Sequence, residues 1–575
     1  MLRQSFSKNP LHVFVLLVLL TLGLYGQTIH YEFCNDDKIF ILQNVFIKHF
    51  SHVRDIWYGF NTRFLAGLSF AFNYWLGGLN VVGYRLFNLA IHILNAFLVY
   101  RLVILTFRTP RMASSHLRHQ SSLIAFWAAL IFLAHPIQIE SVTYISQRIT
   151  AMATFFYLGT ILFYAWARLE NQPFYLLGAY LSMVLGIFTK EMVISAPFAV
   201  LIYELYFFMR SKNEWSRLFL VFLPFIFLIS LLLLVFQMDR SDSLLRLKYQ
   251  IAGAFNWKYL FTEINVMRTY LRLLVLPVNQ LCDYEYPIVQ SFFQVSTLFS
   301  FFLLGSLLVF ALWQFPDRRF LSFSIIWFFI ATAVEAVTVC FVHKGVIYEH
   351  WLYLPMVGFA IFLPLVIFET VTNTKKVQIL LFAVLCLLSV LTFERNKIWR
   401  TELTLWEDVI RKDPNNYRSY AIVGVYYSRL GRLNEAIASD QKALQYFDKF
   451  TTSQKSQLLI NLGAVYGKRG DYDNEIKFNQ NALRYNPNHP QAYSNIGYAY
   501  TLLGDFKKGL EYGKKAVEID PRFAEAHNNL GVTLVLRGEL KTALQHFERA
   551  LELNPDYKEA KANMKLARDL LAGQK

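Results

Sequence analysis

The sequence predicts an all-α protein in which a polytopic transmembrane helical bundle of about 11 spans is followed by an α-solenoid of short helical repeats. Two observations lead to this prediction. The 575 residues are 55% hydrophobic and only 17% charged, whereas a soluble globular protein is about 25% charged. Long apolar runs dominate up to residue 393, and a polar, periodic sequence follows. We therefore expect a membrane domain over 1–393 and a second domain after it.

Eleven apolar runs approach or reach the roughly 20 residues that a helix needs to cross a bilayer. The first run, 11–29, follows Arg3 and Lys8 and has no small-residue cleavage site after it, so we interpret it as an uncleaved span. The other spans are predicted at 84–106, 122–138, 149–167, 174–189, 191–209, 218–236, 295–313, 320–340, 350–370 and 377–393.

Basic residues predict how these spans are oriented. Lys and Arg are concentrated in four connections, "FRTPRMASSHLRHQ", "RSKNEWSR", "PDRR" and "TNTKK", and such loops usually lie in the cytoplasm. All four fall on the same side as the N-terminus, which is therefore expected to be cytoplasmic. An odd number of spans then places everything after residue 393 outside. Loop charge also explains the net charge of +16 without a nucleic-acid partner.

Two predicted outer segments, 30–83 and 237–294, are too long to be simple connections. Both are rich in aromatic residues, as in "IWYGFNTRFLAGLSFAFNYWLGG" and "FNWKYLFTEINVMRTYLRLLVLP". Amphipathic stretches with Trp and Tyr are typical of helices that lie in the membrane interface. Cys34 and Cys282 are both expected on this side, which leaves a disulfide between them open.

The polar half contains a repeat of 34 residues. The spacing is shared by three prolines, three glycines and three alanines: Pro487, Pro521 and Pro555; Gly463, Gly497 and Gly531; Ala482, Ala516 and Ala550. This is the tetratricopeptide pattern, in which small residues let two helices pack closely. An earlier copy begins near Tyr417 and carries a five-residue insertion near "DKFTTSQKS".

The repeat copies define the second domain. We predict about four repeats and a capping helix in 417–575, joined to the last span by a linker helix in 394–416. Such arrays usually bind peptides or proteins. A stabilising appendage and a self-association surface are the alternatives.

Several membrane segments carry a further resemblance. The chain contains "RFLAGLSFAFNYWLGGLNVVGYRLFNLAIHILNA", "HPIQIESVTYISQR", "TKEMVISAPFAVLIYE" and "YEHWLYLPMVGF" in this order. These segments resemble the GT-C membrane glycosyltransferases with C-terminal tetratricopeptide repeats, whose animal members are protein O-mannosyltransferases. The chain is shorter than those members and has fewer repeats, which indicates a bacterial or archaeal relative.

The resemblance implies an activity. Such an enzyme is an inverting transferase that takes a sugar, possibly mannose or another hexose, from a polyprenyl-phosphate carrier in the membrane lipid. It places the sugar on a protein Ser or Thr hydroxyl on the extracytoplasmic side, which is periplasmic or outer in a prokaryote and the ER lumen in a eukaryote. The repeats are expected to bind the protein acceptor. Neither a metal nor another cofactor is expected.

Asp36 and Asp37, in "YEFCNDDKIF" directly after the first span, are the predicted catalytic residues. Carboxylates next to hydrocarbon are costly unless they reach water or serve a function. One of them would take the proton of the acceptor hydroxyl. The other would orient sugar hydroxyls or raise the pKa of its neighbour by like-charge repulsion. The alternative is a solvated turn or a helix cap.

Eight further ionisable residues on the predicted outer side are predicted to bind substrate. Lys190 is the first choice for the donor phosphate, with Glu191 as its partner or as a sugar contact. The others are Glu140, His135, Arg148, Glu349, His350 and Arg63. Each has a structural alternative: an ion pair that only holds a turn, a buried histidine that fixes the Pro turn, or an arginine that reaches the interface. Asn88, His92 and Asn95 share one helix face, a pattern that more often joins helices.

Other function classes remain open on the sequence. A transporter would favour charges near mid-membrane and broken spans, whereas the charges here gather at one side. A membrane-anchored repeat scaffold would leave the ionisable residues and the two long outer segments unexplained. A transferase that modifies an envelope glycan or lipid is the remaining enzymatic alternative.

Overall fold

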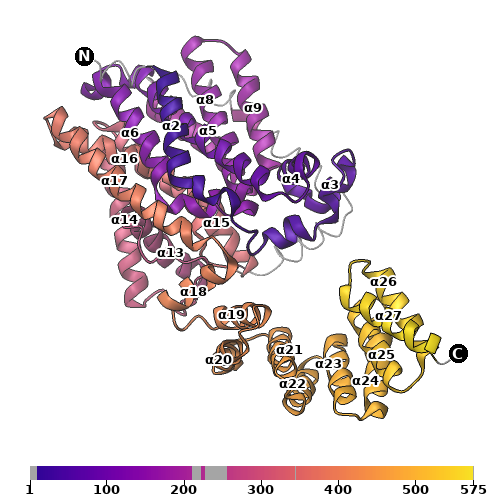
Figure 1. Cartoon of the computed structure of the whole chain (residues 1–575). Coiled ribbons are helices and arrows are strands. Elements are labelled where there is room, and N and C mark those ends of the chain that lie inside the picture. Colours follow the sequence, from indigo (N-terminus) through magenta and orange to yellow (C-terminus); the bar gives the residue numbers. More distant parts are fainter. Residues whose placement is uncertain (1–8, 210–221, 227–254, 344, 574–575) are drawn as a thin grey trace. The chain divides into compact units, whose positions relative to one another are not determined.

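The computed structural model describes residues 9–209, 222–226, 255–343 and 345–573. Every regular element among these residues is helical, which confirms the all-α prediction (Figure 1). The chain divides into two units, Met1–Asp408 and Val409–Lys575, and each is described by itself. All four cysteines are free, so the disulfide considered for Cys34 and Cys282 is not formed.

The centre of the first unit is the long helix α5 (Val81–Arg108), which contacts α2 (Pro10–Tyr25), α6 (Ser121–Ala134) and α8 (Arg148–Glu170) (Figure 1). The other helices before the second unit are α3 (Val53–Phe60), α4 (Phe64–Gly77), α7 (Ile139–Val142), α9 (Phe174–Ile187), α10 (Ala196–Phe207), α13 (Trp257–Val275), α14 (Val295–Gln314), α15 (Arg319–Val342), α16 (Pro355–Thr370), α17 (Thr374–Ile398) and α18 (Glu402–Lys412), which contains the division.

Three polar side chains of α5 are fully buried and join helices. Asn88 Nδ2 donates to the Val142 carbonyl at 3.1 Å, and Asn95 Nδ2 donates to the Ala151 carbonyl at 2.9 Å. His92 Nδ1 lies 2.8 Å from the Tyr353 hydroxyl. Because buried polar groups need partners, these contacts fix α5 in register with its neighbours, as the one-face pattern predicts.

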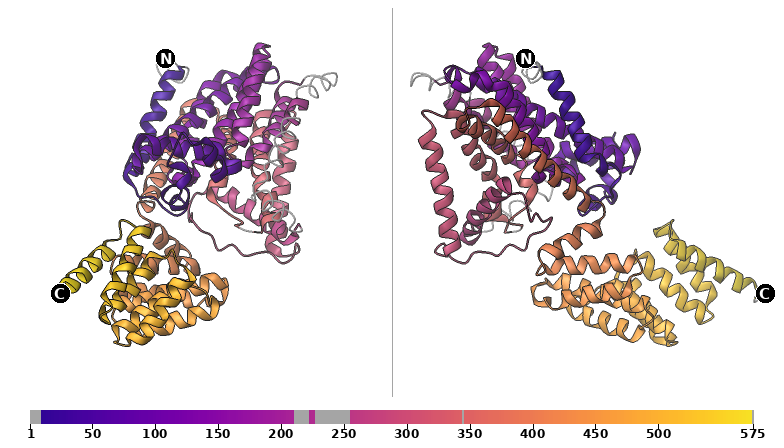
Figure 2. Two further views of the ribbon diagram at one scale, coloured as in Figure 1. Left: turned by 90° about the vertical axis from the view of Figure 1, so that its right-hand side faces the viewer. Right: turned by 60° about the vertical axis from the view of Figure 1, so that its left-hand side comes forward.

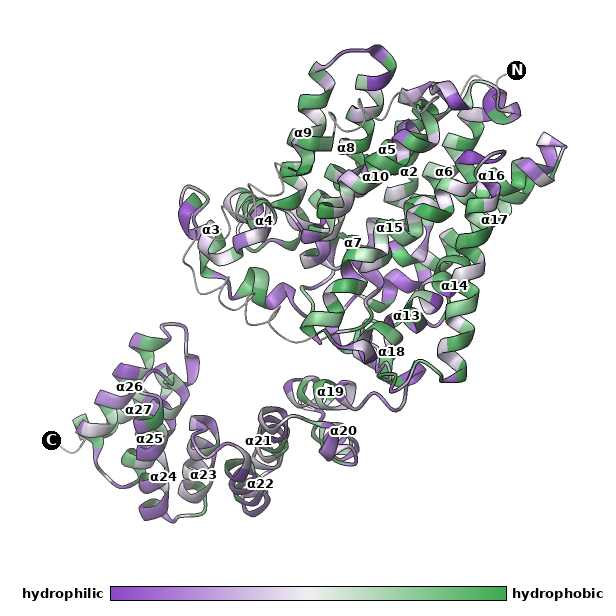
Figure 3. Cartoon of the chain, turned by 180° about the vertical axis from the view of Figure 1, so that it is seen from behind, coloured by the Kyte–Doolittle hydropathy of each residue, from purple (hydrophilic) through white to green (hydrophobic). Residues whose placement is uncertain are grey.

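Seven helices in the described residues are long and apolar enough to cross a membrane. They correspond to the predicted spans 11–29, 84–106, 122–138, 149–167, 295–313, 320–340 and 377–393. Figure 3 shows that the helices of this unit are coloured hydrophobic over most of their length. The chain is therefore a multi-pass membrane protein.

The four remaining predicted spans differ from the observed helices. Spans 174–189 and 350–370 correspond to the shorter apolar helices α9 and α16, and 191–209 corresponds to α10, which has 12 residues. The predicted span 218–236 lies for the most part outside the described residues. The number of eleven stays a prediction.

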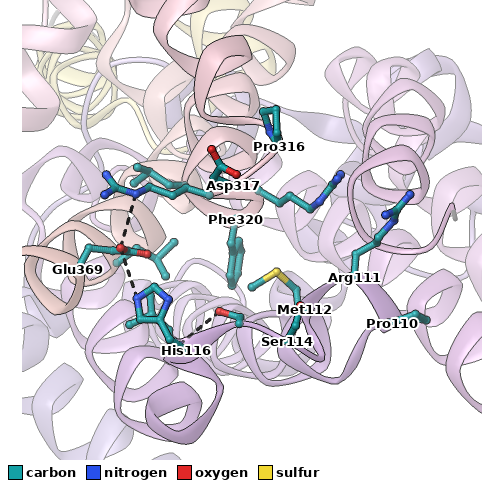
Figure 4. A pocket seen from close by; sticks show the side chains of 15 residues that line it. Pro110, Arg111, Met112, Ser114, His116, Pro316, Asp317, Phe320 and Glu369 are labelled. Carbon is teal, nitrogen blue, oxygen red and sulfur yellow. Dashed lines mark hydrogen bonds and ion pairs between the residues drawn. The ribbon is translucent and has the colours of Figure 1, made fainter.

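The connections between helices gather at two ends of the bundle. At one end, His116 after α5 and Arg318 before α15 both pair with Glu369 near the end of α16 (Figure 4). At the other end, the first outer segment contacts the α7–α8 turn through Asp37 and Ser146. This second end also holds the other residues predicted to form the site.

The segment 30–83 folds over this second end with a small core of its own. Ile41, Ile56, Phe60 and Phe70 pack together and against Ile149 of α8. Helices α3 and α4 form within the segment in which interfacial helices are expected, and Trp75 of α4 has an exposed fraction of 64%. An apolar ring left in the open is suited to the membrane interface.

The second unit consists of four helix pairs and a final helix (Figure 2). The pairs are α19 (Tyr417–Arg429) with α20 (Leu433–Leu444), α21 (Thr452–Lys468) with α22 (Tyr472–Tyr485), α23 (Pro490–Leu502) with α24 (Phe506–Ile519) and α25 (Ala524–Leu536) with α26 (Leu540–Leu553), and α27 (Lys558–Gly573) packs on the last pair. The insertion near 450 forms a short 3-10 turn, Phe447–Lys449, before α21.

Glycine explains why the paired helices approach so closely. A Cβ atom on Gly497 would lie 2.9 Å from the Gly513 nitrogen, which is backbone and cannot move aside. Glycine also makes the turns inside the pairs, since Gly470, Gly504 and Gly538 have φ between 83° and 86°, a region that other residues avoid.

Candidate active site

The two aspartates of the first outer segment have opposite surroundings. Asp37 is fully buried, and its carboxylate accepts backbone N–H groups from Cys34 at 3.1 Å and Ser146 at 2.7 Å. Burial raises the pKa of Asp37 to about 6, although the nearby Arg85 and the two N–H donors oppose that shift. Asp37 therefore ties the acidic turn to the α7–α8 turn.

Asp36 is exposed. Its backbone N–H donates to the Tyr144 hydroxyl at 2.8 Å, so the main chain is anchored while the carboxylate can meet a substrate. Asn35 precedes it with φ of 49°, and the Asn35 side-chain oxygen accepts from Trp406 Nε1 at 3.2 Å. The turn thus presents one carboxylate outward and buries the other.

A second buried carboxyl group, that of Glu140 in α7, contacts the short helix η11 (Glu349–Leu352). Glu140 of α7 accepts the His350 backbone N–H at 2.8 Å, and its other oxygen lies 3.2 Å from His350 Nδ1. Burial raises the pKa of Glu140 to about 8, and burial together with Lys190 lowers the pKa of His350. Burial therefore disfavours the charged form of both members of this pair.

The Glu349 carboxylate is bound by four neighbouring residues. Its carboxylate accepts from the Tyr284 hydroxyl at 2.6 Å, the Leu281 N–H at 2.8 Å and Gln280 Nε2 at 2.9 Å, and it pairs with Arg395 at 3.1 Å. These contacts join residues 280–284 to the end of α17. The structural alternative fits Glu349 better than direct substrate contact.

Two cations predicted to bind substrate form ion pairs here. Lys190 Nζ lies 2.9 Å from Glu335 of α15 and donates to Thr150 Oγ1 at 3.2 Å, with a side chain only 7% exposed. Arg63, 39% exposed, pairs with Glu191 at 3.3 Å. Arg63 is therefore the more accessible cation, and Lys190 the more enclosed one.

The pairs lie close enough to influence one another. The charges of Lys190, Glu335, Arg63 and Asp36 all act on His350. The structure thus brings together residues from the first outer segment, the α7–α8 turn, the Lys190 junction and η11. These four segments are far apart in the sequence.

Two predicted residues stand apart from this group. His135 is buried, accepts the Ile137 N–H at its Nδ1 atom and lies 3.0 Å from the Leu274 carbonyl through Nε2. His135 therefore fixes the Pro136 turn, which was the alternative to a role in substrate binding. Arg148 is also buried, and its guanidinium donates to Asn88, Ser69 and Tyr84. Such contacts leave it inside the protein rather than at a phosphate.

Three acidic or basic residues of this region were not predicted from the sequence. Glu335 pairs with Lys190, Arg395 pairs with Glu349, and Glu263 of α13 is buried near Glu335. Burial and the neighbouring Glu335 raise the pKa of Glu263 to about 9. The sequence could have indicated Glu335, because it is the lone acidic residue in the predicted span 320–340. Acidic residues within a span are usually functional.

An apolar groove of 750 Å³ borders α13 on its other side. Tyr270 of α13 donates its hydroxyl to the Tyr348 carbonyl at 3.1 Å, next to Glu349, so α13 separates the groove from the ionisable group. Arg268 and Arg272 are the charged residues of the lining. The rest of the lining is Leu271, Leu274, Val275, Leu276, Phe299, Leu303, Ser306, Leu307, Phe310, Ser324, Ile325, Phe328, Pro355, Phe359 and Phe362.

Within the described residues, no three His, Cys, Asp or Glu side chains come together as a set of metal ligands would. The expectation that no metal is required stays a prediction.

Comparison with known proteins gives two kinds of similarity. A family model for the tetratricopeptide repeat matches residues 490–523, and a second one matches 524–557. The chain is also 24% identical over 371 residues to "Protein O-mannosyl-transferase F38B6.6" of Caenorhabditis elegans, covering 63% of this chain and 50% of that protein.

A human relative shows the same pattern. "Protein O-mannosyl-transferase TMTC3" of Homo sapiens is 25% identical over 450 residues, covering 70% of this chain and 46% of that protein. The chain thus spans about half the length of these relatives. Among solved structures, the first TPR of Spaghetti (RPAP3) bound to an HSP90 peptide is 28% identical, covers 21% of this chain and 95% of that one, and has a TM-score of 0.20. The named relatives and the repeat models confirm the resemblance to protein O-mannosyltransferases with tetratricopeptide repeats.

Proposed function

We propose that this protein is an integral-membrane glycosyltransferase of the inverting GT-C type. It moves a hexose from a polyprenyl-phosphate carrier to a Ser or Thr hydroxyl of a protein on the extracytoplasmic side. The observation that carries the proposal is that the exposed Asp36 and the ion pairs Lys190–Glu335 and Arg63–Glu191 belong to one group of charges around His350. Both relatives described above are named protein O-mannosyltransferases.

Asp36 is assigned as the general base. Its carboxylate takes the proton of the acceptor hydroxyl while the oxygen attacks the anomeric carbon. The bond from that carbon to the phosphate oxygen breaks, and the polyprenyl phosphate leaves with the electron pair. A single displacement of this kind inverts the anomeric configuration. Asp37 is a positioning residue in this mechanism, because it is buried and holds the turn.

Arg63 and Lys190 are assigned to the donor phosphate. A leaving phosphate gains negative charge, and fixed cations in a site that excludes water stabilise that charge. Each cation already faces a carboxylate, at 3.3 Å for Arg63 and 2.9 Å for Lys190. Donor binding must therefore replace or share those partners, and Glu191 and Glu335 are then available for sugar hydroxyls. The Glu140–His350 pair belongs to the same group of ionisable residues.

The groove beside α13 is assigned to the apolar part of the donor. Its 750 Å³ and its mostly aliphatic and aromatic lining suit an isoprenoid chain. Because α13 lies between the groove and the ionisable residues, a lipid in the groove would have its headgroup within reach of the site. Exposed apolar side chains on α14, such as Phe302 and Val309, suit contact with the bilayer.

The repeats are assigned to the acceptor. Asn461, Asn495, Asn529 and Asn563 recur every 34 residues, on the first helix of successive pairs and on α27. An amide side chain offers both a donor and an acceptor, which matches the main chain of an extended peptide. Asn461, Asn529 and Asn563 are partly exposed, whereas Asn495 is buried and donates to Asn479 at 3.3 Å. The three partly exposed amides are therefore assigned to the peptide, because helical repeat arrays bind along one surface.

The proposal is tested by removing the gene from its host and analysing the envelope by mass spectrometry. We expect O-linked hexose to disappear from one or more proteins and to return with the wild-type gene but not with the Asp36→Asn variant. Losses confined to glycolipids or glycans would instead support the envelope-glycan alternative. Unchanged hexose on all proteins and lipids would contradict transferase activity.

A further inference from the structure

The junction between α17 and α18, residues 395–406, contacts the acidic turn of the first outer segment. Trp406 of α18 donates its Nε1–H to the side-chain oxygen of Asn35 at 3.2 Å. Glu402, at the start of α18, forms an ion pair with Lys38. Asn35 and Lys38 stand directly before and directly after the two aspartates. One helix, which lies 364 to 371 residues later in the chain, therefore holds the turn on both sides.

Two further contacts from the same junction support the turn. The Glu32 N–H donates to the Arg400 carbonyl at 3.4 Å. The Trp399 ring packs on the Tyr144 ring, with the ring centroids 5.4 Å apart. Because the Tyr144 hydroxyl accepts the backbone N–H of Asp36 at 2.8 Å, Trp399 supports the main chain of Asp36 through Tyr144.

The contacts are enclosed at the junction, whereas Asp36 is exposed. Glu402 and Trp406 are buried, and a hydrogen bond inside a protein is electrostatically stronger than one in water. Asn35 has φ of 49°, a backbone region that asparagine adopts more readily than most residues. An exposed carboxylate takes its position from the main chain that carries it. The junction therefore fixes the main chain from which the Asp36 side chain extends.

The junction also contacts two other segments of the candidate active site. Arg395 pairs with Glu349 of η11 at 3.1 Å. The Asn396 side-chain oxygen accepts from Thr143 Oγ1, in the α7–α8 turn, at 2.7 Å. Residues 395–406 thus join the first outer segment, the α7–α8 turn and η11, and these contacts set the spacing of the three segments.

We propose that Trp406 and Glu402 are positioning residues for the general base, an inference that rests on the proposed function. They act through the turn rather than on the substrate. By fixing Asn35 and Lys38, they hold the Asp36 carboxylate at the place where the acceptor hydroxyl is deprotonated. A misplacement of about 1 Å can cost about 10²-fold in rate. A weaker hold therefore lowers turnover and leaves donor binding unchanged.

The first test measures steady-state transfer by the purified full-length protein, with a polyprenyl-phosphate hexose and an acceptor protein. Trp406→Phe keeps an aromatic ring but removes the N–H donor, and Glu402→Gln removes the charge. We expect kcat to fall about 10-fold in each variant, while KM for the donor stays that of the wild type. Glu394→Gln is the matched control, because Glu394 pairs with the exposed Lys397 at 2.6 Å. It should keep the wild-type kcat, and an equal loss in this control would overturn the proposal.

A reversed ion pair separates positioning from general damage. Lys38→Glu and Glu402→Lys each place two like charges together, and the two changes combined restore a pair of opposite charges. Residues in contact give non-additive effects, so the double variant should recover most of the kcat that each single variant loses. A double variant no better than the single variants would overturn the role of the pair.

Amide hydrogen exchange of residues 34–40 tests the contact without enzyme activity. Trp406→Phe and Glu402→Gln should exchange these amides faster than the wild type, and Glu394→Gln should not. Wild-type exchange in both α18 variants would overturn the hold itself, and faster exchange with an unchanged kcat would overturn the positioning role. If the wild type transferred no sugar, the proposed function and the positioning role would both fall, and the exchange comparison would still decide whether the junction holds the turn.

Discussion

At the scale of single residues, we propose a structural role for Asp37 and a catalytic role for Asp36. The Asp37 carboxylate accepts two buried backbone N–H groups. In Asp37→Asn one oxygen is replaced by a donor, so one N–H loses its partner, which costs about 1–3 kcal/mol. We expect faster limited proteolysis of the outer segment in Asp37→Asn than in wild type. Asp36→Asn should digest like wild type, and equal digestion of both variants would contradict the assignment.

Asp440 in α20 gives a pH-dependent prediction. It is fully buried, and neither carboxyl oxygen has a hydrogen-bond partner among the described residues. Burial raises the pKa of Asp440 to about 8, so the folded state holds the proton more tightly than the unfolded chain, where the pKa is about 3.9. The stabilising contribution is complete below pH about 4 and is lost as pH rises to about 8.

Hydrogen exchange of the α19 and α20 amides measures this effect. After correction for intrinsic rates, wild-type protection should fall between pH 6 and pH 9. Asp440→Asn has no group to ionise, so its protection should change less over the same interval. The same pH dependence in both proteins would show that Asp440 does not carry it.

The sequence predicted where ionisable residues gather but not which of them are accessible. Asp36 and Asp37 are equivalent in the sequence, and only the packing of the turn against Tyr144 and Ser146 distinguishes them. His135 and Arg148 have the same ambiguity, since their burial depends on partners distant in the chain. Glu335 was missed because it lies inside an apolar run rather than at its end.

At the scale of elements, the close approach of α23 and α24 depends on glycine. A Cβ at Gly497 would lie within 3.1 Å of backbone atoms of Gly513 and Gly509. Gly497→Ala should therefore push the helices apart and destabilise this pair by about 1–3 kcal/mol. Gly513→Ala is the matched control, since its nearest contact is the tip of the Leu530 side chain at 3.1 Å, which can move.

Chemical denaturation of the full-length protein, monitored by amide hydrogen exchange within α23 and α24, compares the stability of this helix pair in the two variants. Gly497→Ala should lose more protection than Gly513→Ala. The reverse order would contradict the packing argument.

This element was predictable because a 34-residue period repeats the same contact several times. The short helices α9, α10 and α16 were not, because hydropathy alone does not show where a helix gives way to a turn.

At the scale of the whole molecule, the charge pattern predicts the orientation. The basic connections at 108–120 and 315–319 lie at one end of the bundle, together with the end of α16, and basic loops usually face the cytoplasm. A reporter fused after residue 400 should then be extracytoplasmic, while a tag inserted at residue 114 should be cytoplasmic. A cytoplasmic signal from the reporter would place the candidate active site on the wrong side.

The most direct measurement compares sugar transfer by the wild type and Asp36→Asn. The purified full-length protein is given a polyprenyl-phosphate hexose and an acceptor protein identified by the envelope analysis. Loss of general-base help should lower the transfer rate about 10²–10⁴-fold, with donor affinity unchanged within threefold. Glu32→Gln, which removes an exposed carboxylate from the same segment, should keep the wild-type rate. An Asp36→Asn rate equal to wild type would contradict the mechanism.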